Sequence, residues 1–536
     1  MTKYCQVMSF VANIIRACPP RLLGNTAQMT ASKSPVLLGS LIPFIITLAA
    51  YASWFASQTF DAPSWLKWVY VFWIITTADL WFWSYRNAFV SVLSAVESRK
   101  VIPDRSTIRG THQLKVALLY LCCDDFDEGA VGTLLDQTYR NCLVYVLDDS
   151  HLQSNRRRID QYCMNHQIEV IRRETRKGYK PGALNNALRH LPQDIEVFAI
   201  SDSDEKIPRD FVEKCVTILL SSDKTGFVQC RHLVVKQTSK FAQVLSQRMN
   251  SLWLFQQAYR NRYGLVQFQG HGAVLSRKVV EEVGGFPELL VEDFALTLDL
   301  SRAGYSGYFL KDVVCFEDFP PDYFALKTRN VRWATGDFQI LFGVLPKFLL
   351  SSNVSFIEKF DGFASIVGLP MSLIFFFFWL TLPLAGLQNV LGFFRPDLAA
   401  VMGAAYFSPV LATMFYNIYS DGERARPSHQ NYRDPLTYFL VGALLLPSGY
   451  IALLKAIWNY CRKRLSFDIT PRQSKRLPLG EVARLGRVEL LTGFLMLFYV
   501  LLFKALWDIP LILVAASFIL SPFSSFLLGD RQETKV

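Results

Sequence analysis

Two aspartates separated by one residue are the most chemically suggestive feature of this sequence. Asp202 and Asp204, in the stretch "SDSDE", come directly after the apolar run "EVFAI". Two carboxylates at this spacing can face one divalent cation, and hard oxygen ligands favour Mg²⁺ or Mn²⁺. A pair of this kind also occurs in ordinary solvated loops. Its meaning therefore depends on the other charged residues of the chain.

Those residues form an ordered series on both sides of the pair. Upstream are "VLDDS", which contains Asp148 and Asp149, and "KGYKPGALNNAL", which contains Lys180. Downstream is "LLVEDFAL", with Glu292 and Asp293. A carboxylate can act as a general base that accepts the proton of a reacting hydroxyl, and Asp293 can supply it. A carboxylate neighbour and a partly dry crevice would both raise the pKa of such a base.

The stretch "YFALKTRNVRWATGD", residues 323–337, adds two arginines and a tryptophan. Arg329 and Arg332, together with Lys180 and a metal ion on Asp204, can hold a departing diphosphate. Trp333 has a flat apolar face that suits stacking under a sugar ring. The alternative is a helix beside a membrane whose cations meet lipid headgroups.

Short apolar runs that alternate with helical periods must position these residues. The runs are "KVALLYLCC", "CLVYVLDDS", "QIEVIRRE", "EVFAISDSD" and "GFVQCRHLVV", all within residues 100–350. This alternation predicts an α/β domain with a mostly parallel, doubly wound sheet and a ligand crevice at the carboxyl ends of its strands. Acidic residues follow two of these strands. Neither a dinucleotide-binding nor a P-loop glycine pattern is present.

Long apolar runs on both sides of this domain predict a membrane region. Six runs are near the ~20 residues that cross a bilayer: 36–55, 68–85, 363–387, 398–418, 488–506 and 509–528. Cations cluster before the first run and after the fourth, so the domain and both termini are expected in the cytoplasm. The predicted organisation is a segment 1–35, helices in 36–90, the domain 100–350, helices in 360–420, an interfacial segment 434–486, helices in 488–528 and a tail 529–536.

The apolar stretch 434–458 is long enough to cross the bilayer but contains Pro447 and Gly449 at its centre. If it crossed, the many cations between residues 462 and 487 would lie outside. An interfacial helix along the cytoplasmic surface keeps these cations near anionic headgroups. We therefore expect an interfacial helix here, with a crossing as the alternative.

The ordered series resembles the processive family 2 glycosyltransferases, which include the membrane-embedded synthases of cellulose, curdlan, chitin and hyaluronan. Their D, D-x-D, E-D, Q-x-x-R-W pattern is matched over residues 110–480. The resemblance implies a GT-A domain in which Asp148 and Asp149 bind uridine and Lys180 lies near the diphosphate. It implies that Asp202 and Asp204 bind the donor and the metal ion, and that Asp293 is the catalytic base.

The resemblance also suggests acceptor and loop residues. Trp333, Glu292, and Gly270 and His271 of "FQGHGAVLSR" would lie at the acceptor end of the site. The stretch "FDITPRQSKR" resembles the gating loop of cellulose synthases, with Phe467, Thr470 and Arg472 at its three marked positions. A mobile loop of this kind can close on the diphosphate and exclude water. This likeness favours UDP-glucose as donor, whereas the alternative is an ordinary basic loop.

Several positions depart from the family pattern. Arg329 stands where glutamine is usual, and Arg472 replaces lysine, which exchanges a point charge for a bidentate fork. "CCDD" at 122–125 and "SDSDE" also differ from the usual segments. These departures argue against a standard cellulose synthase and favour another β-glucan product, such as a β-1,3, mixed-linkage or capsular polymer.

The sequence thus predicts an inverting, Mg²⁺- or Mn²⁺-dependent, multi-pass enzyme of the plasma (inner) membrane. It would polymerise an exopolysaccharide β-glucan from UDP-glucose and pass the growing chain across the bilayer, with export partners in the envelope left open. No cyclic-di-GMP-binding domain is expected after the last crossing. The alternatives are a UDP-N-acetylhexosamine polymerase, a lipid-linked sugar transferase, and a transporter or receptor with a nucleotide-sensing domain. Nucleic acid is not expected as a partner, because the net charge of +11 is concentrated beside the crossings.

Overall fold

The computed structural model describes residues 114–234, 239, 241–242, 245, 256–367, 435–463, 470, 477–502 and 509–528, with the run 44–50 and scattered positions between 42 and 90. The predicted crossing 398–418 lies outside the described residues, as do half of 36–55, half of 68–85 and most of 363–387. Within the described part of the chain, no single helix is both long and apolar enough to cross a membrane. The bent pair α18 (Leu479–Leu485) and α19 (Arg487–Leu502), with 76° between its halves, reaches the length and composition of a span when the two are combined.

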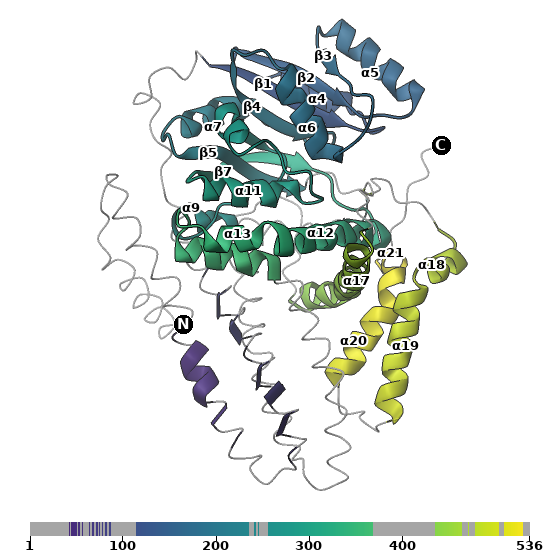
Figure 1. Ribbon diagram of the computed structural model, residues 1–536. Coiled ribbons are helices and arrows are strands. Elements are labelled where there is room, and N and C mark those ends of the chain that lie inside the picture. The colour runs from purple at the N-terminus through teal and green to yellow at the C-terminus, as the bar shows by residue number, and fades with distance from the viewer. Residues whose placement is uncertain are drawn as a thin grey trace, which may run out of the picture.

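A seven-stranded sheet forms the centre of the molecule, in the order β3-β2-β1-β4-β6-β5-β7 (Figure 1). All five predicted strands are present, and two more complete the sheet. Their bounds are β1 Lys115–Cys122, β2 Cys142–Asp148, β3 Glu169–Ile171, β4 Ile195–Asp202, β5 Thr225–Val234, β6 Ala273–Ser276 and β7 Ser306–Glu317.

The expected parallel arrangement is correct except at one strand. β1 pairs in parallel with β2 and β4, and β5 pairs in parallel with β7. β6 is antiparallel to both of its neighbours, β4 and β5, so the sheet is mixed. The prediction from strand and helix alternation missed this because β6 is only four residues long and leads directly into a helix.

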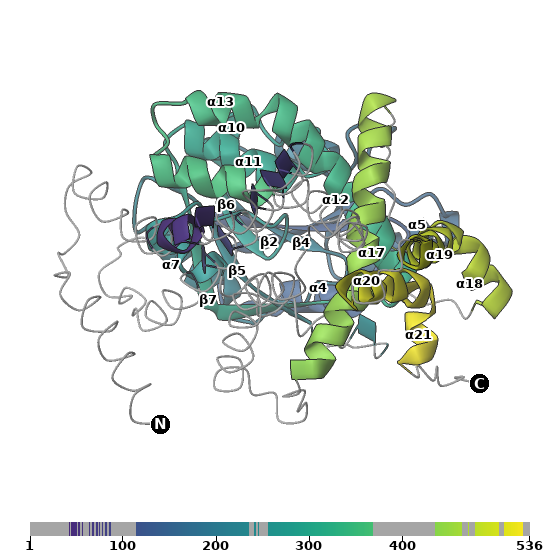
Figure 2. The same ribbon diagram turned by 90° about the horizontal axis from the view of Figure 1, so that it is seen from below.

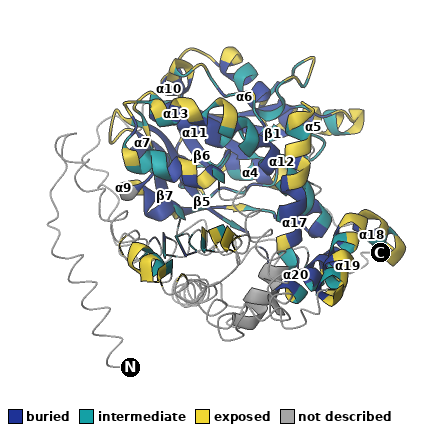
Figure 3. Cartoon of the chain, turned by 60° about the horizontal axis from the view of Figure 1, so that its bottom comes forward, coloured by how far each residue is buried: buried dark blue, intermediate teal, exposed yellow. Residues whose placement is uncertain are grey.

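Helices cover both faces of the sheet. Successive residues of a strand point to opposite faces, so Val116, Leu118 and Tyr120 of β1 pack in one core cluster while Ala117 and Leu119 pack in the other. The first cluster is covered by α4 (Glu128–Leu135), α5 (Gln153–Asn165) and α7 (Phe211–Leu219). The second is covered by α6 (Tyr179–His190), α10 (Arg277–Glu282) and α11 (Glu292–Arg302). Figure 3 shows the buried strands between helices whose outer sides are exposed.

A long helix, α12 (Tyr323–Gly343), runs beneath the sheet and is followed by α13 (Leu345–Leu350) (Figure 1). The Asp322 side chain accepts a hydrogen bond of 2.9 Å from the backbone N–H of Ala325 and caps the start of α12. The described part of the chain contains four further short elements: α9 Arg260–Tyr263, α20 Ile509–Leu520, the 3₁₀ turn η2 Ser521–Phe523 and α21 Ser524–Leu527.

Helix α17 (Pro435–Cys461) occupies the stretch predicted as an interfacial helix. It packs against α12 through the small side chains of Ala334, Ala452 and Ala456. It lies across the direction of α19 and α20, which run away from the sheet (Figures 1 and 2). Its position relative to a membrane stays a prediction.

Candidate active site

A cavity of about 560 Å³ opens where the strand register predicts a ligand crevice. The carboxyl ends of β1, β2 and β4 are level, because Cys122 pairs with Asp148 and Leu121 pairs with Asp202. The first turn of α11 and one face of α12 complete the wall. The cavity is lined by twelve of the predicted site residues: Asp149, Lys180, Asp202, Asp204, Gly270, His271, Glu292, Asp293, Arg329, Arg332, Trp333 and Thr470.

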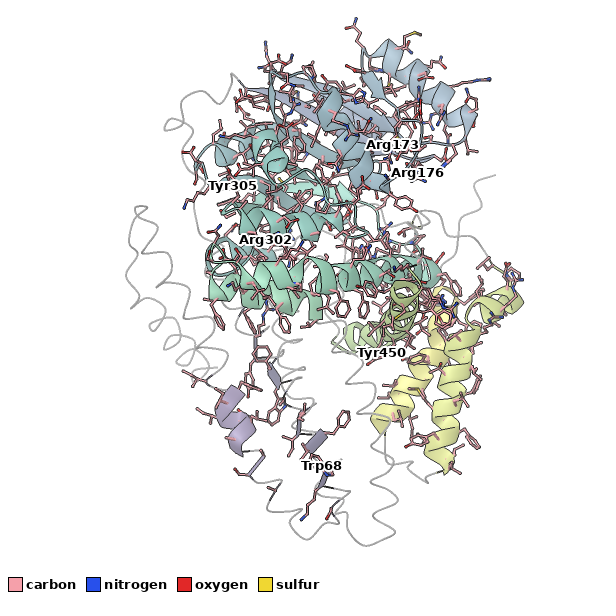
Figure 4. All side chains as sticks on the ribbon, in the orientation of Figure 1. Trp68, Arg173, Arg176, Arg302, Tyr305 and Tyr450 are labelled. Atoms are coloured by element: carbon pink, nitrogen blue, oxygen red, sulfur yellow. The ribbon has the colours of Figure 1, made fainter. Side chains whose placement is uncertain are left out.

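The two neighbouring aspartates after β2 occupy different environments. Asp148 is 2% exposed and does not line the cavity; its carboxylate accepts hydrogen bonds from Arg172 Nε at 2.7 Å and from the backbone N–H of Ser150 at 2.9 Å. Asp149 lines the cavity and accepts two hydrogen bonds from Arg173, the shorter at 2.5 Å. Arg176 Nε lies 3.6 Å from the same carboxylate, and both arginines are labelled in Figure 4. The predicted nucleotide contact therefore has a direct geometric basis only at Asp149.

The D-x-D turn is held by contacts on each of its residues. Lys180, near the start of α6, donates a hydrogen bond of 2.6 Å from Nζ to Asp202 Oδ1. Ser203 Oγ donates to Asp125 Oδ2 at 2.7 Å. The backbone N–H of Asp318 donates to Asp204 Oδ2 at 3.4 Å. Burial lowers the pKa of Lys180, but the neighbouring Asp202, Glu292 and Asp293 outweigh this effect and raise it overall. Lys180 is therefore a cation in the cavity.

Glu292 and Asp293 form the first turn of α11. Burial is the main cause that raises the pKa of Asp293, and the backbone N–H of Phe294, Lys180 and His271 lower it in part. Burial, followed by the charge of Asp293, raises the pKa of Glu292. Gly270 has φ +89°, and a Cβ added there would lie 3.4 Å from Asp293 Oδ2 and 3.5 Å from Lys180 Nζ. The absence of a side chain at Gly270 thus leaves room between the carboxylate and the ammonium group.

Arg329 and Trp333 are in contact on one face of α12. The guanidinium carbon of Arg329 lies 4.5 Å from the Trp333 ring centre and 5.0 Å from that of Phe319. Arg329 is 8% exposed, and within the described residues its Nε has no hydrogen-bond partner. The pKa of Arg329 is lowered to about 10, mainly by burial and in part by Arg332, and Glu317 acts in the opposite direction. A buried guanidinium without an ion pair that lines a cavity is suited to bind an anionic ligand.

Two histidines and two glutamates form a buried cluster beside the D-x-D turn. The rings of His232 and His271 stack with centres 4.3 Å apart and planes 6° apart. His271 Nδ1 lies 3.1 Å from Glu205 Oε1, and His271 Nε2 lies 3.4 Å from Glu317 Oε2. Burial lowers the pKa of His271, but Glu205 and Asp202 outweigh this effect and raise it to about 10. The raised pKa of His271 makes it a cation in the cavity wall. Ligand atoms of Glu205, His232 and His271 also lie within 4.8 Å of one another, and we assign no metal ion to them.

Acidic residues in or beside the cavity that were missed in the sequence include Glu205, Glu317 and Asp337. Glu205 directly follows the D-x-D pair, and Glu317 ends β7, so position after a strand could have identified both. Asp337 lines the cavity four residues after Trp333. The helical repeat of 3.6 residues could have placed Arg329, Trp333 and Asp337 on one face of α12.

The predicted gating loop lies largely outside the described residues, including Phe467 and Arg472. Thr470 is described and lines the cavity. Its Oγ1 is buried without a hydrogen-bond partner in the described part of the chain. The loop's closing function stays a prediction.

Comparisons with known proteins agree with this site at the level of the family. Residues 197–419 match the family model described as glycosyl transferase family group 2, and this range contains Asp202, Asp204, Asp293 and Trp333. The expected resemblance to family 2 glycosyltransferases is confirmed for this part of the chain. Together with the mixed sheet, it confirms a GT-A-like α/β fold.

The curated relatives are named as mannosyltransferases. The chain is 25% identical to glucomannan 4-beta-mannosyltransferase 7 from Arabidopsis thaliana over 290 residues, which are 52% of this chain and 51% of that protein. It is 26% identical to glucomannan 4-beta-mannosyltransferase 1 from Cyamopsis tetragonoloba over 227 residues, 40% of this chain and 43% of that one. The chain thus spans about half the length of the curated relatives it matches.

A similar solved structure is a mannosyltransferase from Pyrobaculum calidifontis in complex with GDP-Man and Mn²⁺. It has 17% sequence identity and a TM-score of 0.46, and the similarity covers 74% of this chain and 99% of that chain.

Proposed function

We propose that this protein is an inverting, metal-dependent glycosyltransferase that extends a polysaccharide from a nucleotide-activated hexose. The observation that carries the proposal is that Asp293, Lys180 and the Asp202–Asp204 pair line one shared cavity, with Asp293 beside Lys180. A buried carboxylate close to a cation suits a general base that works next to a phosphate-holding group. The match to glycosyl transferase family group 2 over the same residues supports this chemistry.

In the proposed reaction, Asp293 accepts the proton of an acceptor hydroxyl as its oxygen attacks the anomeric carbon of the donor sugar. The bond from that carbon to the diphosphate oxygen breaks, and the nucleoside diphosphate leaves with the electron pair. Attack from the face opposite the leaving group inverts the configuration. Lys180 and Arg329 bind the diphosphate as its negative charge increases, because both are cations that line the cavity.

The residues present fit a divalent cation at Asp204, with Asp202 as a second candidate. Both are hard carboxylate ligands, the kind that Mg²⁺ and Mn²⁺ prefer. Asp202 Oδ1 accepts a hydrogen bond from Lys180 Nζ, and Asp204 Oδ2 accepts one from the backbone N–H of Asp318. Once bound, the ion would offset negative charge on the leaving diphosphate.

Two nucleotide-activated hexoses are candidates for the donor. The F-x-I-T-x-R stretch supports UDP-glucose and a β-glucan product. The names of the curated relatives support an activated mannose and a β-1,4-linked product. Both donors present a hexose and a nucleoside diphosphate to the same set of residues, so the polymer and its linkage depend on contacts that an assay must resolve.

Extension at a membrane, with transfer of the polymer across it, is part of the proposal. Large apolar side chains exposed on α19 support membrane contact, because soluble surfaces rarely carry so large an apolar patch. The side chains exposed by 57–63% are Leu491, Phe494, Leu495, Phe498, Leu501 and Leu502. α12 lines the cavity, packs against α17 and is joined to α19 by the Lys327–Glu489 pair.

Membranes from cells that express the full chain test the proposal. They are supplied with Mg²⁺ or Mn²⁺ and, separately, with radiolabelled UDP-glucose, GDP-mannose or UDP-N-acetylglucosamine. A labelled polymer sensitive to a β-glucanase or a β-mannanase identifies the donor and the product class. A single-sugar lipid product would reject polymerisation. Nucleotide binding without any sugar transfer would favour the transporter or receptor alternative.

Asp293→Asn is the matched test of the base. The variant should bind the nucleoside diphosphate with nearly wild-type affinity but lose transfer. Asp299→Asn is the control, because Asp299 lies on the same helix, pairs with Arg302 at 2.6 Å and does not line the cavity. An active Asp293→Asn enzyme would show that another group is the base.

A further inference from the structure

Asp337 is a carboxyl group in the cavity to which the proposed reaction assigns no role. It lies on α12, half-buried, and lines the same cavity as Asp293 and Trp333. Among the described residues it has no hydrogen-bond donor and no ion-pair partner. A carboxyl group that lines a cavity and has no partner in the described part of the chain is available to hydrogen-bond a ligand.

The packing of α12 holds Asp337 next to the catalytic turn of α11. The residue before it, Gly336, is buried against Val291: a Cβ added at Gly336 would lie 2.3 Å from Val291 Cγ2 and 3.0 Å from its backbone nitrogen. Two residues after Asp337, Gln339 Oε1 accepts a hydrogen bond of 3.0 Å from the backbone N–H of Leu290. Only glycine permits so close an approach, so the backbone around Asp337 is held against the segment that leads into Glu292 and Asp293.

The electrostatics agree with this proximity. Burial, followed by the charge of Asp293, raises the pKa of Asp337 to about 8. Two carboxyl groups that are close together in a dry site do not both ionise readily. At neutral pH a protonated Asp337 therefore leaves Asp293 free to ionise and can itself both donate and accept a hydrogen bond.

The order of side chains on α12 gives the cavity a direction. At the end of the cavity near the D-x-D turn, Arg329 contacts Phe319, and the charge of Glu317 raises the pKa of Arg329 in part. Trp333 follows one turn later and has Arg329 against its ring. Asp337 follows after another turn, and the charge of Asp293 raises its pKa. The helix thus passes from an anion-binding cation, through an aromatic ring, to a carboxyl group beside the base.

We propose that the carboxyl group of Asp337 hydrogen-bonds a hydroxyl of the terminal acceptor sugar, adjacent to the hydroxyl that Asp293 deprotonates, while the ring lies against Trp333. Asp337 is thus an acceptor-binding residue that positions the sugar for attack and contributes to acceptor choice. The inference rests on the proposed function, because it requires a sugar acceptor in this cavity.

The test measures how donor turnover divides between transfer and hydrolysis. Membranes with each variant receive the labelled donor that the wild type uses, and released nucleoside diphosphate and sugar incorporated into polymer are measured together. Asp337→Ala should raise the ratio of hydrolysis to transfer about tenfold, the scale of one lost hydrogen bond in a binding site, and shorten the polymer. The nucleotide KM should stay within about twofold of wild type, since the donor contacts are untouched.

Asp337→Asn is the conservative variant, because an amide is neutral and both donates and accepts hydrogen bonds. It should retain a ratio near that of the wild type. Asp136→Ala is the control, since Asp136 pairs with the exposed Arg209 and does not line the cavity. If Asp337→Ala fails to fold, Asp337→Leu, which fills the same space with an apolar group, carries the same expectation.

Three outcomes would overturn the inference. One is an unchanged ratio and polymer length in Asp337→Ala. Another is an equal loss of nucleotide release in Asp337→Ala and Asp337→Asn, which would place the residue in the donor reaction. The last is a ratio of hydrolysis to transfer in Asp337→Asn as high as in Asp337→Ala. That result would show that a hydrogen bond from this side chain does not position the acceptor. Failure of the proposed function itself is distinguishable, because the wild type would then release no nucleotide from any sugar donor.

Discussion

The guanidinium group of Arg329 lies against the Trp333 ring, with its central carbon 4.5 Å from the ring centre. In the family that the sequence resembles, glutamine is usual at the position of Arg329. The structure shows that arginine here adds a buried cation to the cavity wall and supports one face of the tryptophan ring. The departure from the pattern therefore changes both the charge of the cavity and the rigidity of its aromatic platform.

Arg329→Gln should weaken binding of UDP or GDP by about 10- to 100-fold, because a charge-assisted contact to the diphosphate is lost. Calorimetric titration of the purified protein with each nucleotide measures this. Arg302→Gln is the matched control, since Arg302 lies outside the cavity and pairs with Asp299. Nucleotide affinity unchanged in Arg329→Gln would show that Arg329 supports only the tryptophan.

His271→Gln should move the acid limb of the pH–rate profile to higher pH. Burial raises the pKa of Asp293, and the positive charge of His271 lowers it in part. The base works in its ionised form, so transfer increases as the pH rises through the pKa of Asp293. Loss of the His271 cation raises this pKa further. Log kcat/KM measured against pH tests this, with the exposed His166→Gln as control. An unchanged limb would show that another group controls it.

Removal of divalent cations with EDTA should abolish transfer, and Mg²⁺ or Mn²⁺ should restore it. Asp204→Asn should raise the metal concentration needed for half-maximal rate by at least about tenfold, because one anionic ligand is lost. The rate as a function of metal concentration measures this. Asp125→Asn is a useful comparison, since Asp125 accepts a hydrogen bond from Ser203 at 2.7 Å and is not a predicted ligand. Full activity of Asp204→Asn at low metal would reject the ligand assignment.

Lys327→Met should destabilise the protein by about 3 kcal/mol, because it leaves the buried carboxylate of Glu489 without its cation. Lys327 Nζ and Glu489 Oε1 are 2.6 Å apart, and the Glu489 side chain is 0% exposed. Thermal unfolding in detergent measures the effect. The double variant with Glu489→Met should recover most of the loss, since no unpaired charge remains. Additive losses in the double variant would show that the pair is not coupled.

This pair also shows how the cavity wall is joined to the C-terminal helices. Lys327 lies on α12 and Glu489 on α19, and Asn330 of α12 donates a hydrogen bond of 3.0 Å to Ser448 Oγ of α17. These partners are more than a hundred residues apart in the chain. No local pattern in the sequence could have paired them, because side chains this distant meet only when the helices pack.

The sequence was sufficient for five of the seven strands and for most of the cavity. Short apolar runs predicted β1 to β5 correctly, since a buried strand is recognisable from its own composition. Because the carboxyl ends of parallel strands share one edge of a sheet, the acids that follow them were expected to converge. Asp149, Asp202 and Asp204 do so.

The tertiary structure decided what each of these side chains faces. Asp148 and Asp149 are adjacent in the sequence, yet only Asp149 lines the cavity, because successive residues of an extended chain point in opposite directions. Arg172 and Arg173 alternate in the same way: Arg172 pairs with Asp148, and Arg173 pairs with Asp149. Asp337 shares the cavity wall with Asp293 because α12 packs against the segment before α11, at Gly336 and Val291 and at Gln339 and Leu290. Residue type and spacing thus determined which chemistry the chain could perform, whereas packing between distant segments determined which residues are in position to perform it.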